Sequence, residues 1–392
     1  MFVEQTVKRN RKLVETAFAL HQSGQIMPDS YLIDMDVLID NAKKILEAAK
    51  VRNIRLYFML KQLGRNPYIA KKLVELGYEG AVVVDFKEAR LMMKHGIPIG
   101  NVGHLVQIPD QMIPEVVAYK PEVITVYSMD KIRKIDEAAG QRGQTQGILL
   151  RVYATEDMIY SGQTAGFQLE EIPQLVKKIK ENCKNIIIRG VTSFPCYLYD
   201  ADVSDMIPTN NLQTVKKAVE ILEDSGIYVD IVNTPSTTCV RTIQRMAEYG
   251  GNCGEPGHGL TGTTPMHAVQ KMDEMPAAVY VSEISHNFEG KAYCYGGGYY
   301  RRSHIENVLV GKDLGDAKQK KVLLPAMDSI DYHIGVSEEC TIGDTAVMAF
   351  RYQIFVTRSD VVLVKGIQSG KPEIIGVYDS LGSEKEGQES LL

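Results

Sequence analysis

Ile54-Arg55-Leu56-Tyr57-Phe58-Met59-Leu60 is a nearly continuous apolar run that ends directly before Lys61. Such a run is typical of a strand buried on both faces, as in a parallel sheet covered by helices. Lys61 then follows the carboxyl end of this strand. In a (β/α)8 barrel the strand ends form the catalytic mouth, where partial desolvation makes a lysine amine a usable nucleophile. The simpler alternative is a lysine whose stem covers apolar surface while its charge stays in water.

Seven further apolar runs follow Lys61, and they end near Asp85, Val106, Tyr127, Tyr153, Ser193, Asn233 and Glu255. Segments with helical spacing separate most of them: 67–76, 87–95, 129–139, 169–182, 212–225 and 237–249. Eight strand-and-helix units over about 200 residues predict an α/β fold, a (β/α)8 TIM-like barrel. An open doubly wound sheet is the alternative, but the first strand lacks the glycine-rich phosphate turn of that fold.

The segments that flank this repeat have a different pattern. Residues 1–22 have the apolar spacing of an amphipathic helix, and 31–34 form a short strand. After Pro276, eight strand-like runs follow with turns between them, which predicts an all-β domain. We therefore expect four parts: an N-terminal helical extension (1–28), a barrel (29–272), an all-β domain (273–381) and a flexible tail (382–392).

Composition limits the partners and the compartment. The 392 residues carry a net charge of −5 without long runs of one sign, so neither nucleic acid nor an anionic membrane is expected as a partner. No secretory or membrane-spanning segment is recognisable. The six scattered cysteines form no C-x-x-C pair, which favours free thiols in the cytoplasm. A small-molecule ligand is the expectation, and the histidines have no metal-ligand spacing.

Two loops near the end of the barrel are suited to an anion. The loop 233–238 offers several hydroxyls and opens a helix, whose first N–H groups favour a phosphate. The loop 254–259 contains Gly257, which permits close approach of a ligand, and His258, which is placed to reach a phosphate. An ordinary helix cap and a tight turn explain each loop equally well in isolation. Together with Lys61, the loops indicate pyridoxal 5′-phosphate (PLP).

The sequence also resembles a known family. Residues 31–41, 255–262 (EPGHGLTG), 295–299 (YGGGY) and Met327-Asp328 are similar, in this order, to motifs of alanine racemase-like, fold-type III PLP enzymes, and YhfX-type proteins are the most similar group. The resemblance covers residues 30 to about 365. It implies a PLP-dependent amino-acid racemase or epimerase that acts as a homodimer with shared active sites.

The resemblance assigns roles to individual residues. Lys61 corresponds to the lysine that binds PLP covalently and acts as one base, and Ser236-Thr237-Thr238 corresponds to the phosphate loop. Tyr295 corresponds to the acid/base on the opposite face, supplied by the partner subunit; without the resemblance, it would be interpreted as a packing aromatic. Phe194 stands where the family has a histidine stacked on the cofactor ring. Met327-Asp328 corresponds to a pair that reaches the substrate of the neighbouring subunit.

Three positions depart from the racemase pattern. Glu255 replaces the arginine that faces the pyridine nitrogen, and Glu255-Pro256-Gly257 is similar to the E-P-G motif of fold-type III amino-acid decarboxylases. Met327, however, replaces the cysteine of those decarboxylases, and a thioether cannot donate a proton. The substrate-side arginine falls at Thr164, so that the carboxylate of a substrate must be bound elsewhere. The phosphate-binding tyrosine is missing, and Arg65 is the candidate replacement.

Three functions therefore remain open at this point. A racemase uses Lys61 and Tyr295 as its two bases. A decarboxylase is favoured by Glu255 but not by Tyr295 or Met327. A non-catalytic PLP-binding protein would not need the all-β domain that contributes Tyr295 and Asp328.

Overall fold

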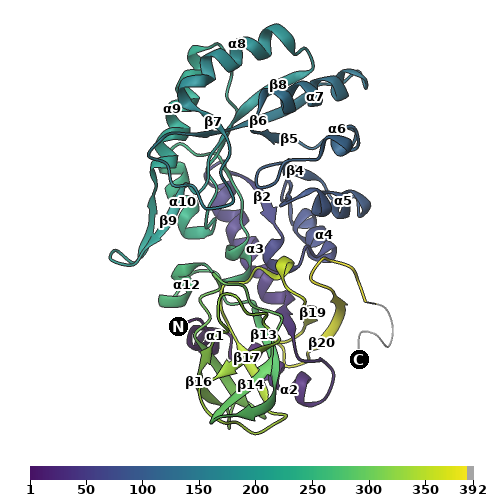
Figure 1. Ribbon diagram of the computed structural model, residues 1–392, viewed down its shortest axis with the longest axis vertical. Coiled ribbons are helices and arrows are strands. Elements are labelled where there is room, and N and C mark those ends of the chain that lie inside the picture. Colours follow the sequence, from purple (N-terminus) through teal and green to yellow (C-terminus); the bar gives the residue numbers. More distant parts are fainter. Residues whose placement is uncertain (386–392) are drawn as a thin grey trace. The chain divides into compact units, whose positions relative to one another are not determined.

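The computed structural model describes residues 1–385 and divides them into two compact units. The first, here called the barrel unit, comprises Ile45–Leu60 and Pro67–Gly257. The second, here called the β unit, comprises Met1–Lys44, Lys61–Asn66 and the chain from His258 onward. Figure 1 labels many of the helices and strands of both units.

The barrel unit contains a closed sheet of parallel strands, which confirms the predicted (β/α)8 barrel. Going around the sheet, the order is β2-β3-β4-β5-β6-β8-β11-β12, and β12 pairs with β2 to close it. Each of the eight predicted runs contains one of the strands. Their bounds are β2 (Arg55–Met59), β3 (Gly80–Val82), β4 (Ile99–Val102), β5 (Val123–Val126), β6 (Gln146–Tyr153), β8 (Ile186–Thr192), β11 (Ile231–Asn233) and β12 (Cys253–Gly254).

Helices cover the outside of this barrel, as Figure 1 shows for α5 to α8. They are α4 (Pro67–Leu76), α5 (Phe86–Lys94), α6 (Ile113–Tyr119), α7 (Met129–Gly140), α8 (Ile172–Asn182), α9 (Asn210–Asp224) and α10 (Val240–Glu248). Only α6 was not predicted, because seven residues make less than two turns and show little periodicity. The hairpin of β9 (Tyr197–Asp200) and β10 (Asp205–Pro208) was not predicted either.

Ion pairs close the amino-terminal end of the barrel. Arg55 Nη1 lies 2.5 Å from Glu122 Oε1, and Arg55 Nε lies 3.1 Å from Glu79 Oε2. Arg189 Nη2 lies 2.5 Å from Asp230 Oδ2. These side chains occupy the starts of the strands, which leaves the carboxyl ends for a ligand, as in other barrels of this type.

The β unit confirms the predicted all-β domain. A closed ring of strands, β13-β18-β15-β16-β17-β14, is extended on one side by β1, β19 and β20. Their bounds are β1 (Ser30–Asp34), β13 (Ala278–Phe288), β14 (Lys291–Tyr295), β15 (Asn307–Gly311), β16 (Lys318–Leu323), β17 (His333–Val336), β18 (Thr345–Met348), β19 (Asp360–Lys365) and β20 (Glu373–Tyr378). Strand β18 ends at Met348, and a 3-10 turn, η4 (Ile354–Val356), follows.

The N-terminal segment belongs to the β unit. Strand β1 pairs with β13 and β19 rather than with a barrel strand. Residues 1–22 form two helices, α1 (Phe2–Arg9) and α2 (Arg11–Gln22), rather than one, because Asn10 leaves the helical conformation and its side chain caps Leu13 N–H at 3.2 Å. Apolar residues of both helices join one core with those of β13, β18 and β19. The unit boundaries therefore differ from the expected domain boundaries at 28 and 272.

Of the predicted tail, the structure describes residues 382–385, whereas 386–392 lie outside the described residues. Lys385 N–H donates to Val377 O at 2.9 Å, and Lys385 Nζ pairs with Asp360 at 2.5 Å. No helix within residues 1–385 has the length and apolar character needed to cross a bilayer. The six cysteines are free thiols.

Candidate active site

A buried carboxylate lies at the carboxyl end of the barrel. Glu255, which follows β12, is 8% exposed. Asn233 at the end of β11 donates through Nδ2 to Glu255 Oε1 at 2.8 Å, and Asn101 of β4 donates to the same oxygen at 3.3 Å. Both asparagines are fully buried. Two fixed amide donors therefore hold the carboxylate in one position at the mouth of the barrel.

A second layer of hydrogen bonds orients these two amides. Thr125 Oγ1 on β5 donates to Asn101 Oδ1 at 2.8 Å, which turns Asn101 Nδ2 toward the carboxylate of Glu255. Asn233 Nδ2 also donates to Thr192 Oγ1 on β8 at 3.2 Å. Asn101 was not among the residues predicted for the site. The available signal was an amide that interrupts the apolar run 97–102, close to a strand end.

The predicted phosphate loop, 236–238, is hydrogen-bonded to Glu255. Ser236 (φ 138°) and Thr237 (φ 52°) both have positive φ, which is strained for residues other than glycine and is common at ligand sites. The nine-residue helix α10 begins at Val240. Thr238 is buried, and its Oγ1 accepts a hydrogen bond from Glu255 N–H at 3.1 Å. The structure therefore brings the phosphate loop and Glu255 together.

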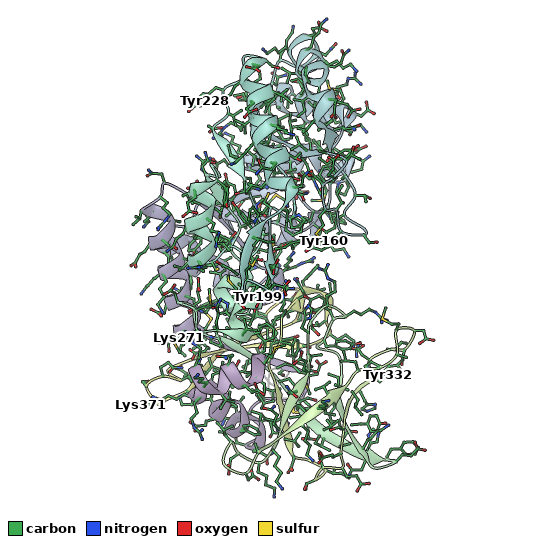
Figure 2. All side chains as sticks on the ribbon, turned by 90° about the vertical axis from the view of Figure 1, so that its left-hand side faces the viewer. Tyr160, Tyr199, Tyr228, Lys271, Tyr332 and Lys371 are labelled. Atoms are coloured by element: carbon green, nitrogen blue, oxygen red, sulfur yellow. The ribbon has the colours of Figure 1, made fainter. Side chains whose placement is uncertain are left out.

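Phe194 lies in an aromatic group at the same end of the barrel. It follows β8 and is half-buried. Its ring centroid is 6.0 Å from that of His104, which follows β4, and 5.8 Å from that of Tyr160, which is labelled in Figure 2. Phe194 thus lines one part of the mouth, and no hydrogen bond or ring contact connects it directly to Glu255 within residues 1–385.

Lys61 begins a tight turn after β2, in the segment that clusters with the β unit. The 3-10 turn η1 (Lys61–Leu63) starts two residues beyond the end of β2, and Lys61 is half-buried. Gly64 (φ +64°) is required here, because a Cβ atom would approach Val361 Cγ2 to 2.9 Å. Arg65 is 4% exposed, and its guanidinium lies 5.2 Å from the Phe355 ring centroid. Arg65 therefore has an aromatic neighbour in its own unit.

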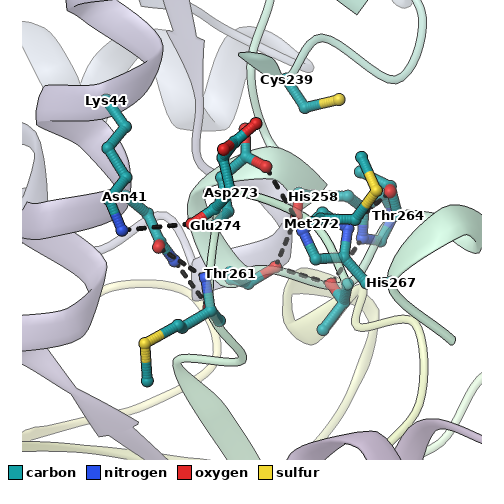
Figure 3. A network of polar contacts seen from close by, with 12 residues as sticks. Asn41, Lys44, Cys239, His258, Thr261, Thr264, His267, Met272, Asp273 and Glu274 are labelled. Atoms are coloured by element: carbon teal, nitrogen blue, oxygen red, sulfur yellow. Dashed lines mark hydrogen bonds and ion pairs between the residues drawn. The ribbon is translucent and has the colours of Figure 1, made fainter. Parts of the chain in front are cut away.

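His258 belongs to a polar network in the β unit (Figure 3). Its Nδ1 lies 3.1 Å from Thr263 Oγ1, which lies 2.6 Å from Thr261 Oγ1. Burial lowers the pKa of His258 well below its ordinary value, and the charges of Arg351 and Lys61 lower it further. His258 is therefore neutral at pH 7.

Gly257 is buried at the end of the barrel unit, whereas Tyr295, Met327 and Asp328 are exposed on the β unit. Tyr295 ends β14 and is 41% exposed, with its ring centroid 6.2 Å from that of His333. Met327 is 76% exposed, and Arg301 Nη1 lies 2.8 Å from its sulfur. Asp328 is exposed beside it. These side chains can be reached by a second molecule.

Comparison with known proteins assigns the family. Residues 33–265 match the model of the alanine racemase N-terminal domain, and residues 279–374 match that of the YhfX-like C-terminal domain. The chain belongs to the alanine racemase-like family of fold-type III PLP enzymes. Uncharacterized protein YhfX of Escherichia coli (strain K12) is 45% identical over 98% of this chain and 99% of its own length.

Solved structures with the fold of this alanine racemase-like chain have different activities. An alanine racemase from Clostridium difficile 630 superposes with a TM-score of 0.61 at 18% identity, covering 91% of this chain and 99% of its own. Diaminopimelate decarboxylase from M. jannaschii superposes with a TM-score of 0.65 at 15% identity, covering 95% and 93%. Others are an aldolase and a dehydratase. At these identities the likeness establishes the fold alone, and the reaction has to be argued from the site.

Proposed function

We propose that this chain is a PLP-dependent amino-acid racemase or epimerase. Bound PLP would draw electrons from the α-carbon of an attached amino acid and so make its α-proton acidic. Lys61 is the proposed attachment residue because it lies two residues beyond the carboxyl end of barrel strand β2. The observation that carries the cofactor proposal is the buried Glu255 carboxylate with its two amide donors.

The residues at the barrel mouth fit both ends of PLP. A fixed carboxylate such as Glu255 would keep a proton on the pyridine nitrogen, which increases electron withdrawal. The strained turn at Ser236-Thr237 and the start of α10 would bind the phosphate, and Thr238 connects this turn to Glu255. Four further residues complete the proposed cofactor contacts: Arg65, Phe194, Gly257 and His258.

Tyr295 distinguishes racemisation from the other reactions of the family. A racemase needs a proton donor on each face of the α-carbon, and Lys61 provides only one of them. Tyr295 carries a phenol hydroxyl at the end of β14 and is 41% exposed, so a second subunit could use it at its own site. We extend the proposal to a homodimer in which Met327 and Asp328 approach the substrate of the neighbouring subunit.

The exposed apolar side chains around this segment support the dimer. Tyr332, which is labelled in Figure 2, is 68% exposed and Ile330 is 60% exposed, and both lie within a few residues of Met327. Large exposed apolar groups near one another mark interaction surfaces. Mixing Lys61→Ala and Tyr295→Phe subunits tests the shared site: subunit exchange should restore activity that neither variant has alone. No recovery after confirmed exchange would contradict it.

The direct test of the function is a panel of amino acids incubated with the PLP-loaded protein. We expect the opposite enantiomer of at least one amino acid to accumulate until both enantiomers are equal, without release of carbon dioxide. Chiral chromatography and carbon dioxide capture measure the two products in the same sample. Stoichiometric carbon dioxide with no enantiomer exchange would contradict the proposal and favour the second candidate.

That second candidate is an amino-acid decarboxylase. Glu255 favours this candidate, because a protonated pyridine nitrogen also stabilises the negative charge that stays on the α-carbon when carbon dioxide leaves. Met327 counts against it, since its sulfur cannot return a proton. A third candidate, a non-catalytic PLP-binding protein, gains support only if PLP binds and the whole panel is left unchanged. The free thiols of all six cysteines fit the cytoplasm, which we propose as the compartment.

A further inference from the structure

Arg151 is a buried cation on a barrel strand. It lies on β6, is 2% exposed and pairs in register with Thr192 on β8. Thr192 in turn accepts a hydrogen bond from Asn233, one of the two donors to Glu255. Residues in register on parallel strands point to the same face. Arg151 therefore points into the barrel, one strand away from the Glu255 network.

The guanidinium of Arg151 is held at the carboxyl end by neutral oxygens. Nη1 donates to His104 O at 3.2 Å and to Tyr127 Oη at 3.1 Å, and Nη2 donates to Gln163 O at 2.7 Å. The guanidinium carbon also lies 5.3 Å from the Tyr127 ring centroid. The turns after β4, β5 and β6 thus fix the orientation of the guanidinium.

Within residues 1–385, no carboxylate forms an ion pair with this guanidinium. The other two arginines on barrel strands, Arg55 and Arg189, form ion pairs with Glu122 and Asp230. Arg151 forms no ion pair with any carboxylate of residues 1–385, although it is the most buried of the three. A buried charge without a counter-charge is costly, and neutral acceptors compensate only part of this cost. A bound anion would supply the rest.

Gln163, whose backbone carbonyl oxygen accepts from Arg151 Nη2 at 2.7 Å, directly precedes Thr164. Thr164 is the position where the racemase pattern has its substrate-side arginine. The cation missing at position 164 is therefore present beside it, on the side chain of Arg151.

We infer that Arg151 binds the α-carboxylate of the amino-acid substrate. The inference rests on the proposed function and specifies its substrate class: amino acids with a free α-carboxylate, not their amides or decarboxylated amines. It also bears on the reaction. A carboxylate held by a cation is stabilised as an anion, which opposes its departure as neutral carbon dioxide and favours loss of the α-proton instead. Arg151 therefore favours racemisation over decarboxylation.

A spectral titration of the PLP-loaded protein tests this without requiring turnover. Each amino acid of a D and L panel is compared with its own amide, and the concentration that gives the half-maximal change in PLP absorbance is recorded. We expect the acid to bind about 10- to 100-fold more tightly than the amide, the range of a charge-assisted hydrogen bond. In Arg151→Met, the half-maximal concentrations of the acid and of its amide should lie within about threefold of each other.

Two further variants make the result decisive. Arg189→Met removes a barrel arginine that already has Asp230 as its partner, and it should keep the full preference for the acid. Arg151→Lys covers the case in which Arg151→Met does not fold: one ammonium cannot replace the planar fork, so the preference should fall at least about threefold.

Each outcome of the titration has a defined meaning. An unchanged preference in either Arg151 variant overturns the inference, as does a wild-type protein that binds PLP but neither acids nor amides, or both equally. Failure to take up PLP would overturn the proposed function and this inference with it. PLP uptake without preference for the acid would overturn this inference alone.

Discussion

Asn233 Nδ2 donates to Glu255 Oε1 at 2.8 Å, and the exposed fraction is 0% for Asn233 and 8% for Glu255. The same nitrogen reaches Thr192, so one amide connects the ends of three neighbouring strands, β8, β11 and β12. Burying a carboxylate costs desolvation free energy, which the two amide hydrogen bonds offset only in part. Such buried charges occur mostly at functional sites. This relationship links the stability of the barrel mouth to the proposed cofactor.

Removing that amide should therefore destabilise the protein. Asn233→Ala leaves Glu255 with one donor fewer in a buried position, which should lower the free energy of unfolding by about 1–3 kcal/mol. Urea denaturation of the apo protein measures this change in the free energy of unfolding. Asn182→Ala is the matched control, because Asn182 donates only to Lys178 O on the exposed face of α8 and should change stability by less than about 0.5 kcal/mol. Equal effects of the two substitutions would contradict the account.

Glu255→Gln should separate cofactor binding from chemistry. Glutamine keeps the shape and can still accept from Asn233 and Asn101, so folding and PLP attachment should persist. It cannot hold a proton on the pyridine nitrogen by charge, and turnover should fall on the order of 100-fold or more. Steady-state rates of enantiomer formation measure the loss. Activity within threefold of wild type would show that the carboxylate is not used in this way.

Tyr295→Phe should produce an asymmetric defect. If Tyr295 exchanges the proton on one face only, the variant should lose α-proton exchange from one enantiomer by about 100-fold or more and keep exchange from the other through Lys61. NMR in deuterated water measures the rate of α-proton exchange separately for the D and the L enantiomer. Tyr293→Phe, two residues earlier on β14 with its ring stacked on His286, is the control and should affect neither enantiomer. Symmetric loss in Tyr295→Phe would contradict a two-base reaction.

Asp29 should make stability depend on pH. Burial raises the pKa of Asp29 from its ordinary 3.8 to about 6, although Ser359 and Tyr280 donate to it at 2.5 and 2.9 Å. The folded state therefore holds this proton more tightly than the unfolded state does. Its contribution to the free energy of unfolding is complete below pH 4 and is lost as the pH rises to about 6, with an upper limit of about 3 kcal/mol.

The comparison of Asp29→Asn with wild type isolates this contribution. The asparagine does not titrate, so the difference in unfolding free energy between the two proteins should change between pH 4 and 6.5 and stay constant above it. Chemical denaturation at several pH values provides the measurement. A constant difference across the whole range would mean that Asp29 does not titrate in this window.

Much of the fold could be predicted because the barrel strands are apolar on both faces. The run before Lys61 and the seven later runs each contain a strand, since covered parallel strands leave a strong local signal. The break at Asn10 and the short helix α6 left weak signals, because one capping side chain or two turns barely change the periodicity. The pairing of β1 with β13 was not predictable, since its register depends on residues nearly 250 positions apart.

The candidate site could be outlined from sequence where the chemistry of one residue is distinctive. Lys61, Glu255 and the hydroxyl loop at 236–238 stand at strand ends and could be selected from sequence. Asn101 left only a weak signal, an amide near a strand end, and Arg151 left none, because their significance lies in their partners. Asn101 reaches Glu255 from another strand, and Arg151 has no carboxylate as an ion-pair partner within residues 1–385. Hydrogen-bond partners and missing counter-charges are properties of the folded chain and leave no local pattern.

Covalent labelling shows whether Lys61 is the residue that holds PLP. The protein is incubated with PLP, reduced with borohydride and digested, and the labelled peptide is identified by mass spectrometry. We expect one pyridoxyl group per chain, on Lys61, and none in Lys61→Ala, while Lys72→Ala on the exposed face of α4 labels like wild type. Label spread over surface lysines, or no label on Lys61, would contradict it.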